Sequence, residues 1–340
     1  MSTDSNYQVN QWLEMLRSPE VGDRLVAVKS LQHLGEDLAI EGLITALKDE
    51  STAVQKIAVS ALWELGNPQA VPALLEHLGD WDPEVRIEAL SALGELISSH
   101  HLSLLLDALG KENVNLQLNI LILLRKIHDI GSLDAVLSFF NSQHPELREA
   151  AVTTLRYLNQ VQICPKALSL LNDADNNVRR ATAITLGYLK DGKIPGLLSQ
   201  SISHDSDWQV RKNAAISLVN HANSVAVSTL KNGITDENWQ VRKSIIQLLQ
   251  KAPQIELLPL LIESLRSDQY SDVRKEAAIA LSHLTIGHPS SLEALDALKT
   301  GLNDEDTEVQ ICCQKAIEKI ESNVKQRSTA SKPDVSTVDG

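Results

Sequence analysis

The sequence predicts an all-α protein, an α-solenoid of about ten two-helix repeats. Two observations lead to this class. A pattern of apolar residues recurs about every 31 residues along almost the whole chain of 340 residues. The hydrophobic content is 43% but aromatic residues make up only 3%, so Leu, Ala, Ile and Val carry it. Aliphatic side chains of this kind are typical of helices that pack on helices.

The repeat is defined by an anchor residue, in most copies a Val, at the start of a helix. Successive anchors are 31 or 32 residues apart, except that the last follows after 36 residues. Four residues after the anchor a small residue is common (Ala58, Ala89), and eight residues after it Leu is common (Leu62, Leu93). These positions share one face of a helix, so each copy predicts an amphipathic helix. The anchors are Asp23, Val54, Val85, Leu116, Leu147, Val178, Val210, Val241, Val273 and Val309.

A second helix follows each anchored helix and is marked by an apolar residue at position +24, such as Leu47. Between the two helices, Gly35, Gly66 and Gly192 suit a left-handed helix end. Pro83 suits the first helical position, where a missing N–H costs nothing. Each hairpin has no core of its own, so stacking must bury the shared faces. Residues of N-cap type precede the anchors by three positions: Ser51, Asp82, Asn113, Asp175, Asp207, Asn238 and Asp306.

Two segments carry a family resemblance: "DWDPEVRIEALSALGEL" (residues 80–96) and "DADNNVRRATAITLGYL" (residues 173–189). Each combines Asp, a short gap, Val-Arg, and then Ala and Leu at helical spacing. They resemble the HEAT-repeat family, in particular the short HEAT-like repeats of phycobilisome lyases, over roughly residues 10–321. We therefore expect one right-handed superhelix of HEAT-like repeats over residues 1–321. The polar, Ser/Thr-rich segment 322–340 is expected to be a disordered tail.

The resemblance also implies a ladder of ion pairs along the stack. An Arg one position after the anchor, such as Arg211, would meet the loop Asp of a neighbouring repeat, such as Asp236, through its planar fork of donors. Lys111 and Ser142 interrupt the column of loop Asp residues in the fourth and fifth repeats. We expect a weaker ladder there.

A candidate partner-binding surface lies on the side of the anchored helices away from the core, which lines the concave face in HEAT-like solenoids. In the first half of the chain this side is apolar, and "NLQLNILILLRKI" is apolar almost all round, which is typical of a covered helix. Aromatic and Arg residues around an apolar centre have the composition of a binding hot spot. The alternative is that curvature buries these side chains between helices. The candidate residues are Trp63, Ile87, Leu118, Ile122, Arg125 and Arg156.

A second candidate surface is a basic column two positions after the anchors in the second half. Stacked about 10 Å apart, these cations would form a stripe for an acidic protein segment, a carboxylate-bearing ligand or a phosphate backbone. The alternative is an ordinary solvated face. Two tryptophans just before the anchors would either grip a peptide or planar ligand or cover the stacked loops. The residues are Arg180, Lys212, Lys243 and Lys275, together with Trp208 and Trp239.

The sequence indicates no catalytic, cofactor-binding or metal-binding residues, because Walker, GxGxxG, HExxH and GxSxG motifs do not occur in it. Cys164, Cys312 and Cys313 form an odd set without framework spacing, which favours a reducing compartment. With no signal-peptide pattern and no long apolar stretch, we expect a cytoplasmic protein that does not enter a membrane.

The favoured interpretation is a scaffold or adaptor that binds a partner protein on its concave face. The family resemblance offers a first alternative, a phycobiliprotein bilin lyase or lyase-like chromophore chaperone, for which a bilin would be the cofactor. A second alternative is a HEAT-like nucleic-acid-binding protein. A net charge of −13, from 44 acidic and 31 basic residues, argues against nucleic acid as the partner. The sequence gives neither the identity of the partner nor the oligomeric state.

Overall fold

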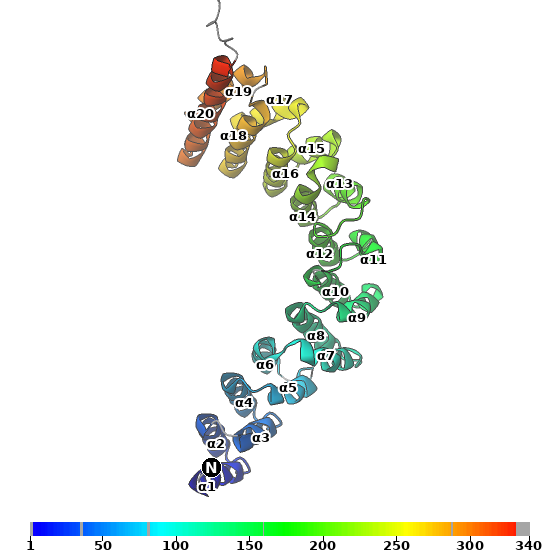
Figure 1. Ribbon diagram of the computed structural model, residues 1–340, viewed down its shortest axis with the longest axis vertical. Coiled ribbons are helices and arrows are strands. Elements are labelled where there is room, and N and C mark those ends of the chain that lie inside the picture. Colours follow the sequence, from blue (N-terminus) through cyan, green and yellow to red (C-terminus); the bar gives the residue numbers. More distant parts are fainter. Residues whose placement is uncertain (1–2, 35–36, 80–81, 159, 287, 331–340) are drawn as a thin grey trace, which may run out of the picture. The chain divides into compact units, whose positions relative to one another are not determined.

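The computed structural model of the chain describes residues 3–34, 37–79, 82–158, 160–286 and 288–330. Within these ranges every regular element is an α-helix or a 3-10 helix, which confirms the all-α class (Figure 1). The helices form two compact units, which divide in the sequence between Val161 and Gln162. The single solenoid over residues 1–321 stays a prediction. Within each unit the helices are arranged as stacked antiparallel hairpins. The handedness of the superhelix stays a prediction.

The first unit pairs an outer row of helices with a row of anchored helices, which begin near the repeat anchors. The outer row contains α1 (Thr3–Met15), α3 (Asp37–Ala46), α5 (Val71–His77), α7 (Leu102–Leu109) and α9 (Leu133–Ser138). The anchored row contains α2 (Val21–Leu34), α4 (Thr52–Leu65), α6 (Pro83–Leu96), α8 (Val114–Ile127) and α10 (Pro145–Tyr157). Short 3-10 helices lead into or extend the outer helices: Pro68–Ala70, Ser99–His101, Ile130–Ser132 and Phe139–Asn141.

The second unit repeats this arrangement. Its outer row contains α11 (Pro165–Leu168), α13 (Ile194–His204), α15 (Val227–Ile234), α17 (Leu258–Ser267) and α19 (Ser291–Gly301). Its anchored row contains α12 (Asn176–Leu186), α14 (Trp208–Leu218), α16 (Trp239–Lys251), α18 (Ser271–Thr285) and α20 (Thr307–Ala330). The 3-10 helices are Ser169–Asn172, Val219–Ser224 and Ile255–Leu257.

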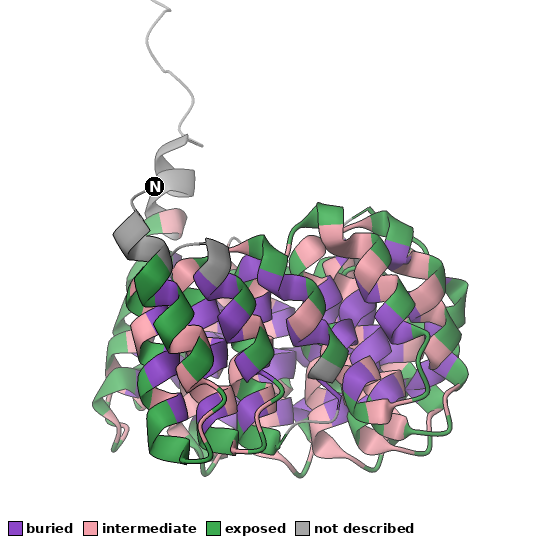
Figure 2. Ribbon diagram, turned by 90° about the horizontal axis from the view of Figure 1, so that it is seen from below, coloured by how far each residue is buried: buried purple, intermediate pink, exposed green. Residues whose placement is uncertain are grey.

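The core of each unit follows the predicted periodicity. In α4 the anchor Val54, the small residue Ala58 and the Leu62 that follows are all fully buried. The corresponding positions of the other anchored helices are buried in the same way, apart from the exposed Asp23 in α2. Buried residues lie on the sides of the helices that face neighbouring helices, and exposed residues lie on the outside (Figure 2). A one-sided apolar pattern repeated in every copy is therefore sufficient to stack the hairpins.

Most of the predicted helix caps are present. The carboxylate of Asp82 accepts a hydrogen bond from the backbone N–H of Glu84 at 2.9 Å, and Pro83 occupies the first turn of α6. Asp207 caps α14 in the same way, with bonds from the N–H groups of Gln209 and Val210. These caps satisfy donors that would otherwise lack a partner at the helix start.

The predicted left-handed helix ends are only partly present. Gly66 ends α4 with a φ of 64°, as expected. Gly192 does not have a positive φ, so the prediction for this residue is wrong, and Gly35 lies outside the described residues. Among the described residues, His128 also forms a left-handed end, with a φ of 55°, after α8. A left-handed end therefore depends on the path of the loop and not only on the presence of Gly.

The C-terminal segment differs from the sequence prediction in its first part. Helix α20 continues to Ala330, beyond the boundary at residue 321 at which a disordered tail is predicted. Residues 331–340 lie outside the described residues.

Candidate binding face

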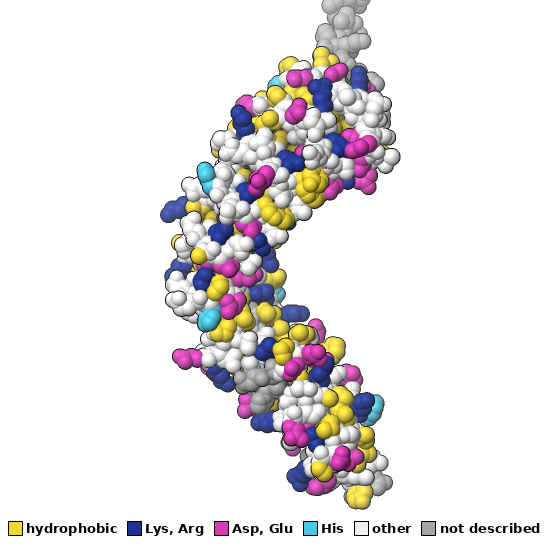
Figure 3. All heavy atoms as spheres, turned by 180° about the vertical axis from the view of Figure 1, so that it is seen from behind, with side chains coloured by type: hydrophobic (Ala, Val, Ile, Leu, Met, Phe, Trp, Pro, Cys, Tyr) yellow, Lys and Arg dark blue, Asp and Glu magenta, His cyan; other side chains and the backbone are white. Residues whose placement is uncertain are grey.

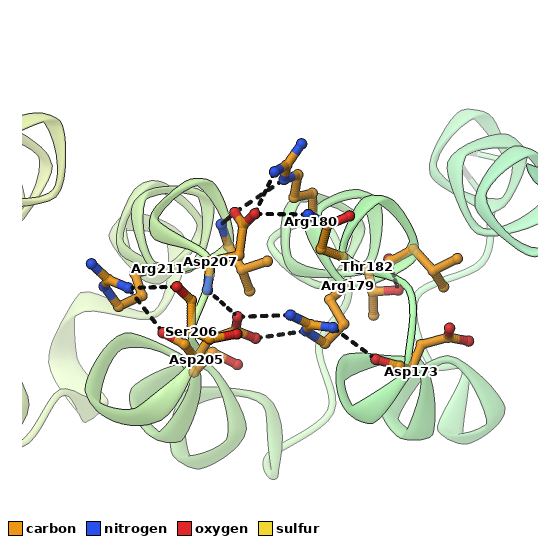
Figure 4. A network of polar contacts seen from close by, with 12 residues as sticks. Asp173, Arg179, Arg180, Thr182, Asp205, Ser206, Asp207 and Arg211 are labelled. Carbon is orange, nitrogen blue, oxygen red and sulfur yellow. Dashed lines mark hydrogen bonds and ion pairs between the residues drawn. The ribbon is translucent and has the colours of Figure 1, made fainter. Parts of the chain in front are cut away.

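A first ladder of ion pairs joins successive hairpins through their loops. Arg211 shows the geometry: its Nε and Nη2 donate to the two carboxylate oxygens of Asp236, at 2.7 and 2.9 Å. Its Nη1 donates to the backbone oxygens of Asp205 and Ser206, at 2.9 and 3.3 Å. One guanidinium thus closes its own loop and binds the loop of the next hairpin, an arrangement that Arg179 repeats with Asp205 in Figure 4.

The pairing of Arg with loop Asp that the family resemblance implies is confirmed. Each of these side chains is at most 16% exposed, so the bidentate pairs are shielded from water and from salt. Four consecutive rungs lie in the second unit. The rungs are Arg24–Asp49, Arg179–Asp205, Arg211–Asp236, Arg242–Asp268 and Arg274–Asp304.

Glutamine replaces the ladder Arg in three hairpins. The side-chain amide of Gln55 donates to the backbone oxygen of Asp49 at 2.7 Å, and that of Gln310 donates to Asp304 at 2.6 Å. Gln117 donates to the backbone oxygen of Lys111 at 3.0 Å. Each Gln therefore keeps the contact that closes its own loop. Its neutral amide forms no ion pair, so the ladder is interrupted at each Gln. The weaker ladder expected around Lys111 and Ser142 stays a prediction.

A second ladder of ion pairs joins successive anchored helices to one another. A cation two positions after one anchor pairs with an acid one to three positions before the next. In the first unit Lys56 lies 2.9 Å from Glu84. In the second unit the pairs are Arg180–Asp207, Lys243–Asp272 at 3.3 Å and Lys275–Glu308 at 2.6 Å.

Most residues of the predicted basic stripe belong to the second ladder. Three of its four members, Arg180, Lys243 and Lys275, are paired with carboxylates. The ammonium of the fourth, Lys212, lies 5.4 Å from the centre of the Trp208 ring. The stripe therefore presents much less positive charge than the sequence suggests, and binding of an acidic ligand there stays a prediction.

The predicted pair of edge tryptophans takes part in contacts between neighbouring side chains. The ring of Trp239 stacks on that of Tyr270, with centroids 5.0 Å apart and an interplanar angle of 15°. The guanidinium of Arg242 lies 6.0 Å from the Tyr270 centroid. These contacts agree with the alternative in which the aromatic rings cover the stacked loops.

The ion pair between Arg180 and Asp207 predicts an acid-sensitive contribution to stability. The guanidinium holds the pKa of Asp207 well below its usual range. The contribution is therefore fully present above about pH 4, the unfolded pKa, and is lost as the pH falls toward the folded value. Asp207→Asn keeps an N-cap residue but removes the charge. Because Arg180 is partly exposed, we expect a loss of about 1 kcal/mol in the free energy of unfolding at pH 7.

Urea unfolding at pH 7 and at pH 2.5 tests this expectation. The difference between the wild type and Asp207→Asn should shrink at the lower pH. Asp82→Asn is the matched control, because the Asp82 carboxylate also caps a helix, and Asp82 takes part in none of the ion pairs among the described residues. A difference that is the same at both pH values would contradict the assignment.

An apolar face interrupts the second ladder in the first unit. Ile87 and Leu118 stand where a cation would stand, in α6 and α8, and Ile87 is 67% exposed. Trp63 on α4 is 48% exposed and Ile122 on α8 is 38% exposed. We call Trp63, Ile87, Leu118 and Ile122 the apolar face. Small groups of hydrophobic side chains bordered by charged ones are visible in Figure 3.

Two grooves lie next to each other on this face. The larger, of about 530 Å³, runs between α4 and α6 and includes Ile57, Trp63 and Ile87 in its walls. The smaller, of about 210 Å³, lies between α6 and α8 and includes Ile87, Leu90 and Leu118. Ile87 is thus the ridge between two hollows that have mainly apolar linings. The alternative in which curvature buries these side chains does not hold for Trp63 and Ile87 in the described structure.

The two arginines predicted to border the apolar face take different positions. Arg125 is turned toward α10, where it donates to the hydroxyl of Thr154 and to the backbone oxygen of Ala150, both at 3.3 Å. Burial lowers the pKa of Arg125. Arg156 is half-buried and donates to the hydroxyl of Tyr157 at 3.2 Å. The donors of both side chains are thus partly engaged within the chain.

The described residues hold no group of three or more His, Cys, Asp or Glu side chains that could bind a metal ion. Burial raises the pKa of the Cys313 thiol to about 12, so it stays protonated and unreactive. Across the described ranges, no helix is both long and apolar enough to cross a membrane.

Sequence reasoning missed the second ladder although its signal is present. The cation at position +2 and the acid just before the next anchor recur together, as in Lys56 with Glu84 and Lys275 with Glu308. Comparing these two columns would have shown that the cations are paired. It would also have singled out Ile87 and Leu118 as the residues that depart from the pattern.

Among solved structures, an engineered protein is similar to this chain, with 20% identity, a TM-score of 0.51, and coverage of 92% of this chain and 99% of that protein. Kap95 in its complex with Nup1 is 15% identical, with a TM-score of 0.65 and coverage of 96% and 53%. The karyopherin Kap121p, bound to the extreme C-terminus of the protein phosphatase Cdc14p, is 14% identical, with a TM-score of 0.59 and coverage of 97% and 43%.

This chain spans about half the length of these two relatives. At such low identity the likeness shows the fold alone, an α-solenoid. A comparison with curated proteins gives no match. The model of the protein family described as HEAT repeats matches residues 9–80, 71–155, 133–198 and 194–282, which together cover most of the sequence. The lyase-type subgroup stays a prediction. On the strength of these matches, the chain belongs to the HEAT-repeat family.

Proposed function

We propose that this chain is a scaffold that binds a partner protein on the apolar face of its first unit. The observation that carries the proposal is the interruption of the second ladder by Ile87 and Leu118. Lys56 and Glu84 show that an ion pair fits this position. Exposed apolar side chains in its place cost solubility, so they are expected where another surface covers them.

The geometry of the face supports binding of a protein. Trp63 is large and amphipathic, and it lies at the wall of a groove whose other wall contains Ile87. An aromatic residue beside a hollow is the usual centre of an interface hot spot. The solenoid neighbours support the same reading, since Kap95 and Kap121p are both described in complexes with proteins or protein segments.

The double variant Trp63→Ala with Ile122→Asp tests the proposal. The wild-type chain, purified from its native cell, should carry one protein in stoichiometric amount, and the double variant should bind that protein at least about tenfold more weakly. Ile216→Asp is the matched control, because Ile216 has the same register as Ile122 and is 50% exposed on α14. Circular dichroism should show equal helix content in all three proteins. Retained binding by the double variant would remove the apolar face as the site.

Each of the two alternative functions that the sequence leaves open can be tested separately. A bilin lyase coexpressed with pigment and apoprotein should yield a coloured, zinc-fluorescent adduct. A nucleic-acid-binding protein should be retained on heparin in a salt-sensitive manner.

A further inference from the structure

The two units differ strongly in charge. Residues 1–161 contain 22 acidic and 11 basic side chains, whereas residues 162–340 contain 22 acidic and 20 basic ones. The first unit therefore holds most of the net negative charge of the chain. The apolar face lies entirely within this unit, so any segment that approaches the face enters a negative potential.

The border of the larger groove carries two carboxylates against one ammonium group, whereas the lining of the smaller groove contains Arg86 and no acid. Lys56 and Glu88 both line it, and the ammonium of Lys56 lies 2.9 Å from Glu84 and 3.6 Å from Glu88. One cation thus faces two carboxylates. The Glu84 side chain is 75% exposed and that of Glu88 is 42% exposed, so both can accept a further donor from a ligand. This border favours a positively charged group next to the apolar hollow.

The two grooves set a spacing for the side chains that fill them. They lie on either side of α6, and packed helices are about 8–10 Å apart. An extended chain in the polyproline II conformation rises about 3.1 Å per residue with three residues per turn, so residues i and i+3 lie on the same side, about 9 Å apart. Two large apolar side chains at this spacing would fill both hollows and pass over the ridge formed by Ile87.

We propose that the partner presents an extended segment with two large apolar side chains three residues apart and flanking Lys or Arg residues. This inference rests on the proposed function and adds the chemistry of the ligand to it. A second copy of the chain would bring a like-charged unit onto the face, and nucleic acid would be repelled in the same way. The chain's own residues 331–340 contain two Asp and one Lys and lack a large apolar pair.

Selection from a random library of 15-residue peptides displayed on phage tests the proposal, with the full chain as the target. We expect the enriched peptides to combine the apolar pair with a net positive charge. We expect them to bind the Ile87→Asp variant at least about tenfold more weakly. Ile311→Asp is the matched control, because Ile311 has the same register on α20 and is 51% exposed. This control should bind like the wild type.

Charge is tested separately with the most enriched peptide, synthesised with a fluorescent label. The double variant Glu84→Lys with Glu88→Lys should weaken its binding, measured by fluorescence anisotropy, by about tenfold at low salt. Glu263→Lys with Glu293→Lys makes the same change in net charge on exposed residues of the second unit, and should have a much smaller effect.

The outcomes separate the two proposals. Peptides that depend on Ile87 but are neutral or acidic would overturn the inference on ligand chemistry and leave the proposed function in place. A library that yields no Ile87-dependent peptide would overturn both. Analytical ultracentrifugation tests whether a second copy occupies the face. If the wild-type chain forms dimers and the Ile87→Asp variant does not, a second copy is the occupant and the proposed cationic segment is overturned.

Discussion

Replacing Arg211 by alanine is expected to lower the free energy of unfolding by about 3–5 kcal/mol. Arg211 is only 7% exposed, and its guanidinium binds the carboxylate of Asp236 and two backbone oxygens of its own loop. Without it, the shielded Asp236 loses its ion-pair partner and the loop oxygens of Asp205 and Ser206 lose a donor. Urea unfolding followed by circular dichroism measures the loss.

Two further variants test whether the contacts of the buried Arg211 guanidinium cause the loss of stability. Arg211→Lys keeps the charge but cannot make bidentate and loop contacts at once, so most of the loss should remain. Arg266→Ala removes an ion pair with Asp296 at 3.2 Å in which both side chains are exposed. That loss should be below about 1 kcal/mol. Equal losses for Arg211→Ala and Arg266→Ala would show that burial of the first ladder contributes nothing.

Gly187→Val is expected to lower the free energy of unfolding by about 1–3 kcal/mol. Gly187 lies at the end of α12, directly against α14. A Cβ atom at this position would come within 2.8 Å of the Cβ of Ser217 and within 3.1 Å of its Cα. The Cα belongs to the backbone of α14, so the helices themselves must separate. Urea unfolding at pH 7 gives the change.

Gly196→Ala is the matched control in the same unit. Gly196 lies in the first turn of α13, and a Cβ there would meet nothing within 4 Å. Ala has a higher helix propensity than Gly, so this variant should be stabilised by up to about 1 kcal/mol. If both variants change stability in the same direction, close approach of α12 and α14 is not the reason for the effect at Gly187.

Much of the fold follows from local pattern. The anchor, the small residue and the Leu recur in register, so Val54, Ala58 and Leu62 can be placed in the core from sequence alone. The loop Asp and the Arg are likewise fixed by their positions. What the sequence does not give is backbone conformation that depends on the path of a loop. Gly192 has no positive φ, and His128 has one.

The candidate site was less accessible to sequence reasoning because exposure depends on neighbours in space. Arg125 faces inward because Thr154 and Ala150 on the next anchored helix offer it acceptors. Ile87 is 67% exposed and lines both grooves, one shared with residues of α4 and the other with residues of α8. The basic residues looked unpaired only because their partners stand 27–33 positions later in the sequence.

The alternation of Arg and Gln in the first ladder affects how cooperatively neighbouring hairpins unfold. An Arg couples two hairpins, because opening one leaves a desolvated charge on the other. A Gln closes only its own loop, so its hairpin can open without that penalty. The unbroken run from Arg179 to Asp304 should therefore make the second unit exchange its amide hydrogens as one block. The first unit, with Gln55 and Gln117, should open in smaller segments, so the helices of the proposed binding face could adapt one hairpin at a time.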